Sequence, residues 1–88
     1  MEQLKEDILI ENKNNDIKHI IVYNDDVNTF DHVIESLVDI CNMDIIAANQ
    51  CSLIIHYKGK CDVKSGDYEE LKPKCLELLN RQISAKIE

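Results

Sequence analysis

Two adjacent carboxylates stand in this sequence without a basic residue near them. The stretch VYNDDVNTFDHVI, residues 22–34, runs from β-branched residues straight into Asn24, Asp25 and Asp26, and it contains no Lys or Arg. Such a loop is either solvated, as most turns rich in Asn and Asp are, or it holds a positively charged ligand. The three residues are therefore candidate partners of a cation.

Further along the chain, His56 supplies another polar group and Ile55 an apolar neighbour, while Phe30 follows the acidic loop. If the fold gathers them beside Asn24 and Asp25, they form a polar rim over an apolar hole. That combination suits a free peptide N-terminus, because its ammonium group is joined through one carbon to a side chain that can be hydrophobic. Taken singly, the residues have simpler explanations, namely a solvated turn and a histidine favoured by the dipole of a helix end.

Other chemistries find less support in the spacing. Asp25, Asp26, His32 and His56 are of the types that bind metals, but the acidic pair lies on one turn and no H-x-x-x-H pair exists. There is no G-x-S-x-G motif and no phosphate-binding loop, as many hydrolases would have. Ser36, the candidate for a prosthetic group on an acidic carrier domain, falls in the middle of an expected helix. We therefore expect a binding protein that is not an enzyme and has no cofactor and no metal.

Size and charge limit the class of protein further. A chain of 88 residues is expected to form one small domain with a single core. The formal net charge of −7 disfavours nucleic acid and anionic membranes as partners. The apolar runs are too short to span a membrane and the first residues lack a secretory signal, so a cytoplasmic protein is expected. In the absence of a heptad pattern, we expect a monomer.

The cysteines are expected to be free thiols, since they show no C-x-x-C pair and no spacing typical of zinc ligands. They are Cys41, Cys51, Cys61 and Cys75. Three of them fall in apolar helical patterns and can act as small buried hydrophobes. Cys61 is different, because the neighbouring Lys58, Lys60 and Lys64 could lower the pKa of its thiol.

The expected fold is α+β, with a three-stranded antiparallel sheet packed against three helices in the order β-α-α-β-α-β. Residues 17–23 are β-branched and too few for a helix, which predicts a strand. A helix follows, with Asn28 or Thr29 as N-cap and one apolar face at intervals of three and four positions. That face comprises Phe30, Val33, Ile34, Leu37, Val38 and Cys41.

A second helix is predicted from about residue 44 to residue 57, and Gly59 can end it by adopting a left-handed conformation. A short strand at residues 61–63 and a turn at residues 65–66 come next. The helix places His56 in its last turn.

A third helix and a last strand complete the pattern. The helix is indicated by Tyr68, Leu71, Cys75, Leu78 and Leu79. Pro73 lies within it and predicts a kink or a separate first turn. The alternation of residues 83–87 predicts the final strand.

Two motifs in combination resemble a known family. The run YNDDVNTFDHVIESL at residues 23–37, followed by IIHYKGK at residues 54–60, is similar to the ClpS family of adaptors. These proteins hand substrates with N-terminal degradation signals to the Clp AAA+ protease. Residues 1–16 are polar, acidic and rich in Asn, so we expect a flexible N-terminal tail there, which is also typical of the family. The resemblance implies a ClpS-like core over residues 17–88. The implied partners are the N-terminal domain of a ClpA- or ClpC-type ATPase and proteins beginning with Leu, Phe, Tyr or Trp.

The resemblance also assigns residues. It implies that Asn24, Asp25 and His56 contact the substrate's α-amino group. The pocket for the first side chain is implied to comprise Asp26, Asn28, Phe30, Ser52, Ile55 and Ile83. Many members have Thr in place of Asn28 and Met in place of Phe30 and Ser52, so preferences among first side chains are expected to differ. The alternative is a small acidic protein–protein interaction domain that binds no N-degron.

Overall fold

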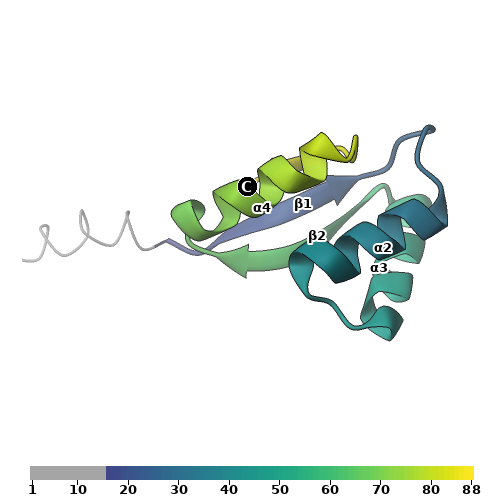
Figure 1. The fold of residues 1–88 in the computed structure, drawn as a ribbon, viewed down its shortest axis with the longest axis horizontal. Helices are drawn as coiled ribbons and strands as arrows, with labels where there is room; N and C mark the ends of the chain where they lie inside the picture. Colours follow the sequence, from purple (N-terminus) through teal and green to yellow (C-terminus); the bar gives the residue numbers. More distant parts are fainter. Residues whose placement is uncertain (1–15) are drawn as a thin grey trace, which may run out of the picture.

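The computed structural model of the protein describes residues 16–88, which form a three-stranded antiparallel sheet with three helices (Figure 1). The elements are β1 (Lys18–Tyr23), α2 (Phe30–Cys41), α3 (Ile45–Lys58), β2 (Lys60–Gly66), α4 (Tyr68–Asn80) and β3 (Ala85–Ile87). This confirms the expected α+β fold and its element order. The expected flexible acidic tail lies outside the described residues, apart from Asp16.

Strand β1 is the centre of the sheet, and its β-branched run explains why it can fill that place. It pairs antiparallel with both β2 and β3, in the order β2-β1-β3. Val22 faces Cys61 on one side and Ala85 on the other. The register with β2 shifts between Ile20 and Ile21, where Val63 is the additional residue of β2. The expected turn at residues 65–66 is wrong, because both residues continue this pairing.

Helix α2 begins at Phe30 because Thr29 caps it, accepting a hydrogen bond from the His32 backbone N–H at 3.1 Å. It ends at Asn42, whose φ of 59° is left-handed. Leu37 is fully buried, but Phe30 is 42% exposed. The prediction that Phe30 belongs to the core face is therefore wrong, since the first turn of α2 extends beyond the core.

Helix α3 is capped by Asp44 and ends at Gly59, whose φ of 98° is the left-handed stop that the sequence predicted. The Gly59 N–H donates to the Ile55 carbonyl at 3.0 Å, and the Gly59 carbonyl accepts from the Asn24 N–H at 2.9 Å. The end of α3 is thereby attached to the chain that leaves β1.

Helix α4 is continuous through Pro73, so the alternative of a separate first turn is wrong. The last strand starts at Ala85, two residues later than expected, because Gln82 has a left-handed φ of 69° and the chain is still turning there. Figure 1 shows α4 lying along β1, while α2 and α3 pack together near the end of the sheet where β1 ends and β2 begins.

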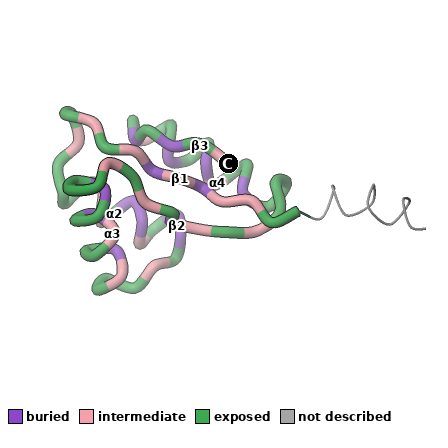
Figure 2. The backbone as a smooth tube through the Cα atoms, turned by 180° about the vertical axis from the view of Figure 1, so that it is seen from behind, coloured by how far each residue is buried: buried purple, intermediate pink, exposed green. Residues whose placement is uncertain are grey.

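One core cluster joins the sheet to the helices. Its fully buried members include Ile20 of β1, Leu37 of α2, and Leu71 and Leu78 of α4. Buried positions alternate with less buried ones along β1 (Figure 2), as expected for a strand with one face on the core. None of the helices within residues 16–88 has the length and apolar character needed to cross a membrane.

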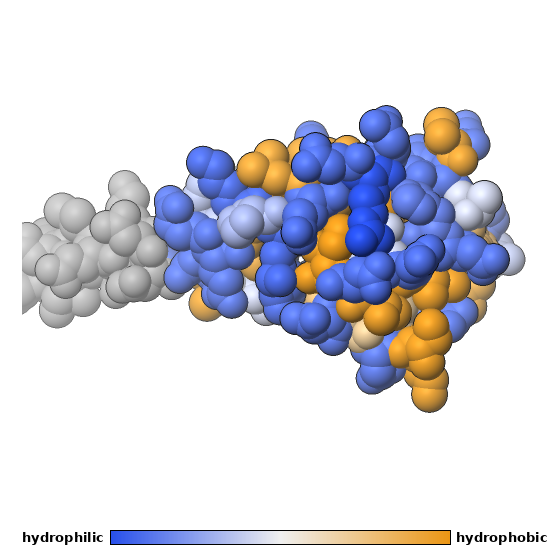
Figure 3. Space-filling model, viewed as in Figure 1, coloured by the Kyte–Doolittle hydropathy of each residue, from blue (hydrophilic) through white to orange (hydrophobic). Residues whose placement is uncertain are grey.

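Helix α3 lacks a polar face, unlike α2. Hydrophobic residues gather on the surface over α2 and α3 (Figure 3), and those that α3 exposes include Ile46 and Leu53. Neither residue lines the cavity described below. Hydropathy alone would thus not have located the site.

Candidate functional site

A cavity of about 300 Å³ lies where the end of β1, the start of α2, the end of α3 and the turn before β3 come together. Its lining comprises Val22, Tyr23, Asn24, Asp25, Asp26, Asn28, Phe30, Val33, Ser52, Ile55, His56 and Ile83. All nine residues that the sequence singled out are among them. The structure therefore brings the two motifs and Ile83 to one place, although Ile83 lies 59 positions beyond Asn24 in the sequence.

The lining residues missed by the sequence reasoning are Val22, Tyr23 and Val33. Two of them directly precede Asn24, and Val33 lies one helical turn after Phe30, where residues three apart share a face. The helical spacing could therefore have predicted that Val33 lines the cavity together with Phe30.

The mouth of the cavity is polar and partly aromatic. Asn24 and His56 are both exposed, and the backbone hydrogen bond from Asn24 to Gly59 keeps the loop beside the end of α3. The His56 ring stands edge-on to the rings of Phe30 and Tyr57, with centroid distances of 5.2 and 4.7 Å. Such edge-to-face contacts orient the imidazole at the mouth.

Asp25 organises the loop between β1 and α2. Its Oδ1 accepts hydrogen bonds from the backbone N–H groups of Val27 and Asn28, both at 2.9 Å. Its Oδ2 accepts from Asn28 Nδ2 at 2.8 Å and from the Ser84 hydroxyl at 3.4 Å. Partial burial acts to raise the pKa of Asp25, but the hydrogen bonds from Asn28 and Val27 outweigh it and hold the pKa below its ordinary value. The carboxylate therefore stays charged at the cavity.

Asn28 connects this loop to a distant turn. Besides its bond to Asp25, its Nδ2 donates to the Gln82 carbonyl at 2.8 Å. Gln82 precedes Ile83, whose backbone N–H donates to the Leu78 carbonyl at 3.0 Å. Asn28 thus holds the turn that brings Ile83 into the cavity wall.

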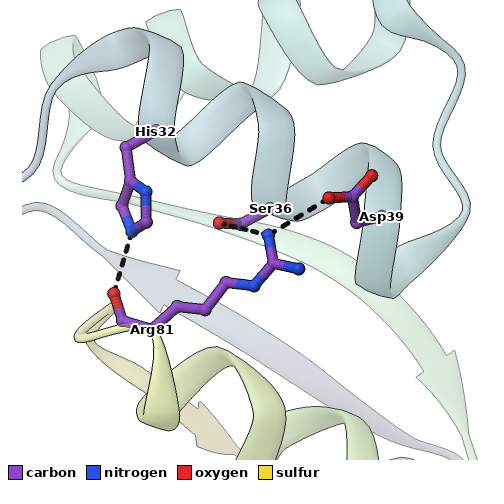
Figure 4. A network of polar contacts seen from close by, with 4 residues as sticks. All are labelled: His32, Ser36, Asp39 and Arg81. Carbon is purple, nitrogen blue, oxygen red and sulfur yellow. Dashed lines mark hydrogen bonds and ion pairs between the residues drawn. The ribbon is translucent and has the colours of Figure 1, made fainter.

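A second set of polar contacts links Arg81, next to the same turn, to side chains of α2 (Figure 4). His32 Nε2 lies 2.8 Å from the Arg81 carbonyl oxygen. The Arg81 guanidinium donates to the Ser36 hydroxyl and to the Asp39 carboxylate, each at 3.3 Å. His32 therefore supports the end of α4 and does not line the cavity. Across residues 16–88, no cluster of three His, Cys, Asp or Glu side chains has the arrangement to hold a metal ion.

The interior of the cavity is apolar except at one point. Val22, Ile55 and Ile83 are almost fully buried, at 1%, 4% and 2% exposure. Ser52, one helical turn before His56, is 3% exposed, and its Oγ has no hydrogen-bond partner within residues 16–88. The cavity thus combines a polar mouth with an apolar interior.

The thiols lie outside this cavity. Cys41 and Cys75 are buried as expected, whereas Cys51 and Cys61 are partly buried, and their Sγ atoms are 3.3 Å apart. Burial, and then the contact with Cys51, raise the pKa of Cys61 to about 12. The idea that nearby lysines lower this pKa is therefore wrong, because desolvation dominates.

Comparison with known proteins finds similarity to one protein family. The family model described as "ATP-dependent Clp protease adaptor protein ClpS" matches residues 13–86. The ATP-dependent Clp protease adapter protein ClpS of Vibrio cholerae is 35% identical over 66 residues, which are 73% of this chain. The chain spans only 62% of that relative's length. The ClpS protein of Campylobacter jejuni is 35% identical over 75 residues, 78% of each chain.

A solved structure shares the fold. The structure of Agrobacterium tumefaciens ClpS2 bound to L-phenylalaninamide superposes with a TM-score of 0.76. It covers 82% of this chain and 94% of its own, at 17% sequence identity.

Proposed function

Because the chain belongs to the ClpS family, we propose that it binds free N-termini with a large hydrophobic first residue and delivers those proteins to a Clp AAA+ ATPase for degradation. The observation that carries the proposal is a cavity that combines a charged, polar mouth with an apolar interior. An N-terminal Leu, Phe, Tyr or Trp presents the complementary chemistry. ClpS2, which has the same fold, is bound to L-phenylalaninamide, a molecule with a free α-amine and an aromatic side chain.

At the mouth, Asn24, Asp25 and His56 hold the α-ammonium group. Asn24 offers a side-chain carbonyl, and Asp25 offers a carboxylate that its hydrogen bonds keep ionised. The 3.4 Å contact from Ser84 is long for a hydroxyl donor, so the ammonium can replace it. The imidazole of His56 is oriented by its aromatic neighbours to contribute a further hydrogen bond.

Inside the cavity, the first side chain is surrounded by apolar residues. Ile55 and Ile83 form buried walls, and Phe30 stands at the rim beside His56. Asn28 lines the wall and holds the loop in place, while Asp26 lies at the exposed edge. Burying one Leu or Phe side chain contributes about 1.5 to 3 kcal/mol, and each charge-assisted hydrogen bond about as much. After the cost of association, an affinity near micromolar follows.

The protein acts by binding, and the chemistry of degradation belongs to the protease. We propose that it works in the cytoplasm as a monomer and docks on the N-terminal domain of a ClpA- or ClpC-type ATPase. The net charge of −7 favours an approaching ammonium group over polyanions. A micromolar grip suits an adaptor that must release its cargo.

The test compares peptides that differ only at the N-terminus. A peptide beginning with Leu should bind with its amine free and lose binding when the amine is acetylated, measured by calorimetric titration. Asn24→Ala and His56→Ala should each weaken binding by about 1 to 3 kcal/mol without unfolding the protein. Gln50→Ala, an exposed change on α3 outside the cavity, is the matched control.

Equal binding of the free and acetylated peptides would overturn the proposal. The protein would then be an acidic interaction domain whose loop holds no N-terminus. If His56→Ala folds normally and binds as tightly as the parent, the role of His56 is wrong, although the remaining assignment can stand.

A further inference from the structure

Ser52 is the polar exception inside an otherwise apolar cavity. The residue is 3% exposed, lines the cavity, and its Oγ has no hydrogen-bond partner. The other buried serine of residues 16–88 differs, because the Ser36 hydroxyl accepts a hydrogen bond from Arg81. A buried hydroxyl without a partner is costly and rare in native proteins. Its position at the cavity therefore calls for an explanation.

A serine inside a helix commonly returns its hydroxyl to the carbonyl four residues earlier. For Ser52 that carbonyl belongs to Ala48, and the absence of any partner means that this bond is not made. The hydroxyl is left with both its donor and its acceptor capacity unused. Ser52 lines the cavity although its Oγ is shielded from water, so a group that enters deeply enough to displace this shielding can bond to the hydroxyl.

The depth of Ser52 fits the far end of an aromatic side chain. Ser52 precedes His56 by four residues of α3, which is slightly more than one helical turn, or about 6 Å along the axis. His56 lies at the exposed mouth, whereas Ser52 is buried among Val22, Ile55 and Ile83. A first residue whose ammonium sits near His56 extends its side chain toward Ser52.

We infer that Ser52 determines specificity within the proposed function, by exchanging a hydrogen bond with the phenolic hydroxyl of an N-terminal tyrosine. The inference rests on the proposed N-terminus binding. Tyrosine and phenylalanine differ only in that hydroxyl. With phenylalanine in the cavity, Ser52 stays unpartnered, because the other buried lining residues offer apolar side chains. The protein therefore prefers proteins that begin with tyrosine over those that begin with phenylalanine.

The experiment measures the ratio of affinities for two peptides that are identical except for Tyr or Phe at position one. In the parent, calorimetric titration should give about tenfold tighter binding of the Tyr peptide. Ser52→Ala, which removes only the hydroxyl oxygen, should bring the two affinities within about twofold of each other. Ser52→Thr restores a hydroxyl and should restore the preference. Ser65→Ala, a matched change at an exposed site on β2, should keep the parent ratio.

A parent that binds the Phe peptide as tightly as the Tyr peptide overturns the inference. So does a preference for Tyr that persists unchanged in Ser52→Ala. A Leu peptide with a free or an acetylated amine is titrated alongside. Amine-dependent binding of Leu without a role for Ser52 defeats the inference alone, whereas loss of amine dependence defeats the proposed function together with it. Circular dichroism of each variant verifies that the fold is retained.

Discussion

Replacing Asn28 by alanine is expected to destabilise the fold and to weaken peptide binding at once, because this side chain links two segments that form the cavity. Its Nδ2 donates to Asp25 at 2.8 Å and to the Gln82 carbonyl at 2.8 Å. Asn28→Ala removes both bonds but keeps the backbone N–H that also donates to Asp25. The acidic loop and the turn before Ile83 would then be free to separate.

The magnitude follows from the two bonds. A hydrogen bond between neutral groups contributes about 0.5 to 1.5 kcal/mol net, and one to a charged group about 1.5 to 3. Both acceptors are partly open to solvent, so water compensates much of the loss. We expect the free energy of unfolding to fall by about 1 to 2 kcal/mol. Binding of a Leu-initiated peptide should weaken about three- to tenfold, since the wall that carries Ile83 is less fixed.

The dependence on pH distinguishes this mechanism from a general loss of packing. The pKa of Asp25 is lowered in the folded protein, so its stabilising effect is present above the unfolded pKa and is lost as the pH falls through the folded pKa. The Asn28 side chain is one cause of that lowering. The difference in stability between parent and Asn28→Ala should therefore be largest near neutral pH and shrink as Asp25 becomes protonated.

Urea denaturation at neutral and at strongly acidic pH measures this difference, and peptide titration measures the binding loss. Asn49→Ala is the matched control, because Asn49 is exposed on α3 and its Nδ2 donates within that helix, to the Ile45 carbonyl. The reasoning is refuted if Asn28→Ala unfolds at the same urea concentration as the parent, or if its deficit is the same at both pH values.

Four further outcomes are expected. Phe30→Ala should raise affinity for Ile- and Val-initiated peptides more than for Leu, since the ring at the rim crowds a branched Cβ; the parent should prefer Leu to Ile by about ten- to a hundredfold, and equal affinities would contradict this. Gly59→Ala should lower the free energy of unfolding by about 1 kcal/mol in urea denaturation, because its φ of 98° strains alanine even though an added Cβ meets nothing within 4 Å; unchanged stability would be evidence against it. With a pKa of about 12, Cys61 should be alkylated far more slowly at pH 8 in the native protein than in urea, and the native rate should rise about tenfold per pH unit. Mass spectrometry measures the rate of alkylation, and equal rates in the native protein and in urea would contradict the raised pKa. Deleting residues 2–14 should leave peptide affinity unchanged while slowing degradation of an N-degron substrate by the Clp machine, and delivery at the full rate would reduce that segment to a solubilising leader.

Several elements were predictable because their causes are local. The β-branched run before Asn24 becomes the central strand, Thr29 caps α2, and Gly59 ends α3 in a left-handed conformation. Each depends on side chains within a few positions of the backbone that they affect. The role of the motifs around Asp25 and His56 could likewise be predicted, since their residue types and spacing resemble one family.

The exposure of Phe30 could not be predicted from local sequence patterns. Helical spacing groups it with Leu37, yet Leu37 is fully buried and Phe30 stands at the rim of the cavity. A period of three and four positions identifies a shared face, but it does not tell how far the core extends along that face. Only the placement of α2 against α3 decided it.

Contacts between distant segments were decided by the tertiary structure alone. Asn28 bonds to the carbonyl of Gln82, 54 positions away. Cys61 touches Cys51 of another element, and desolvation and this contact raise the pKa of Cys61. The unpartnered hydroxyl of Ser52 belongs to the same class, because whether a polar atom has a partner depends on every segment that folds around it. The sequence determined which groups could bind an N-terminus. The packing of α3, the acidic loop and the turn before β3 determined which hydrogen bonds each group already makes and which remain available to a ligand.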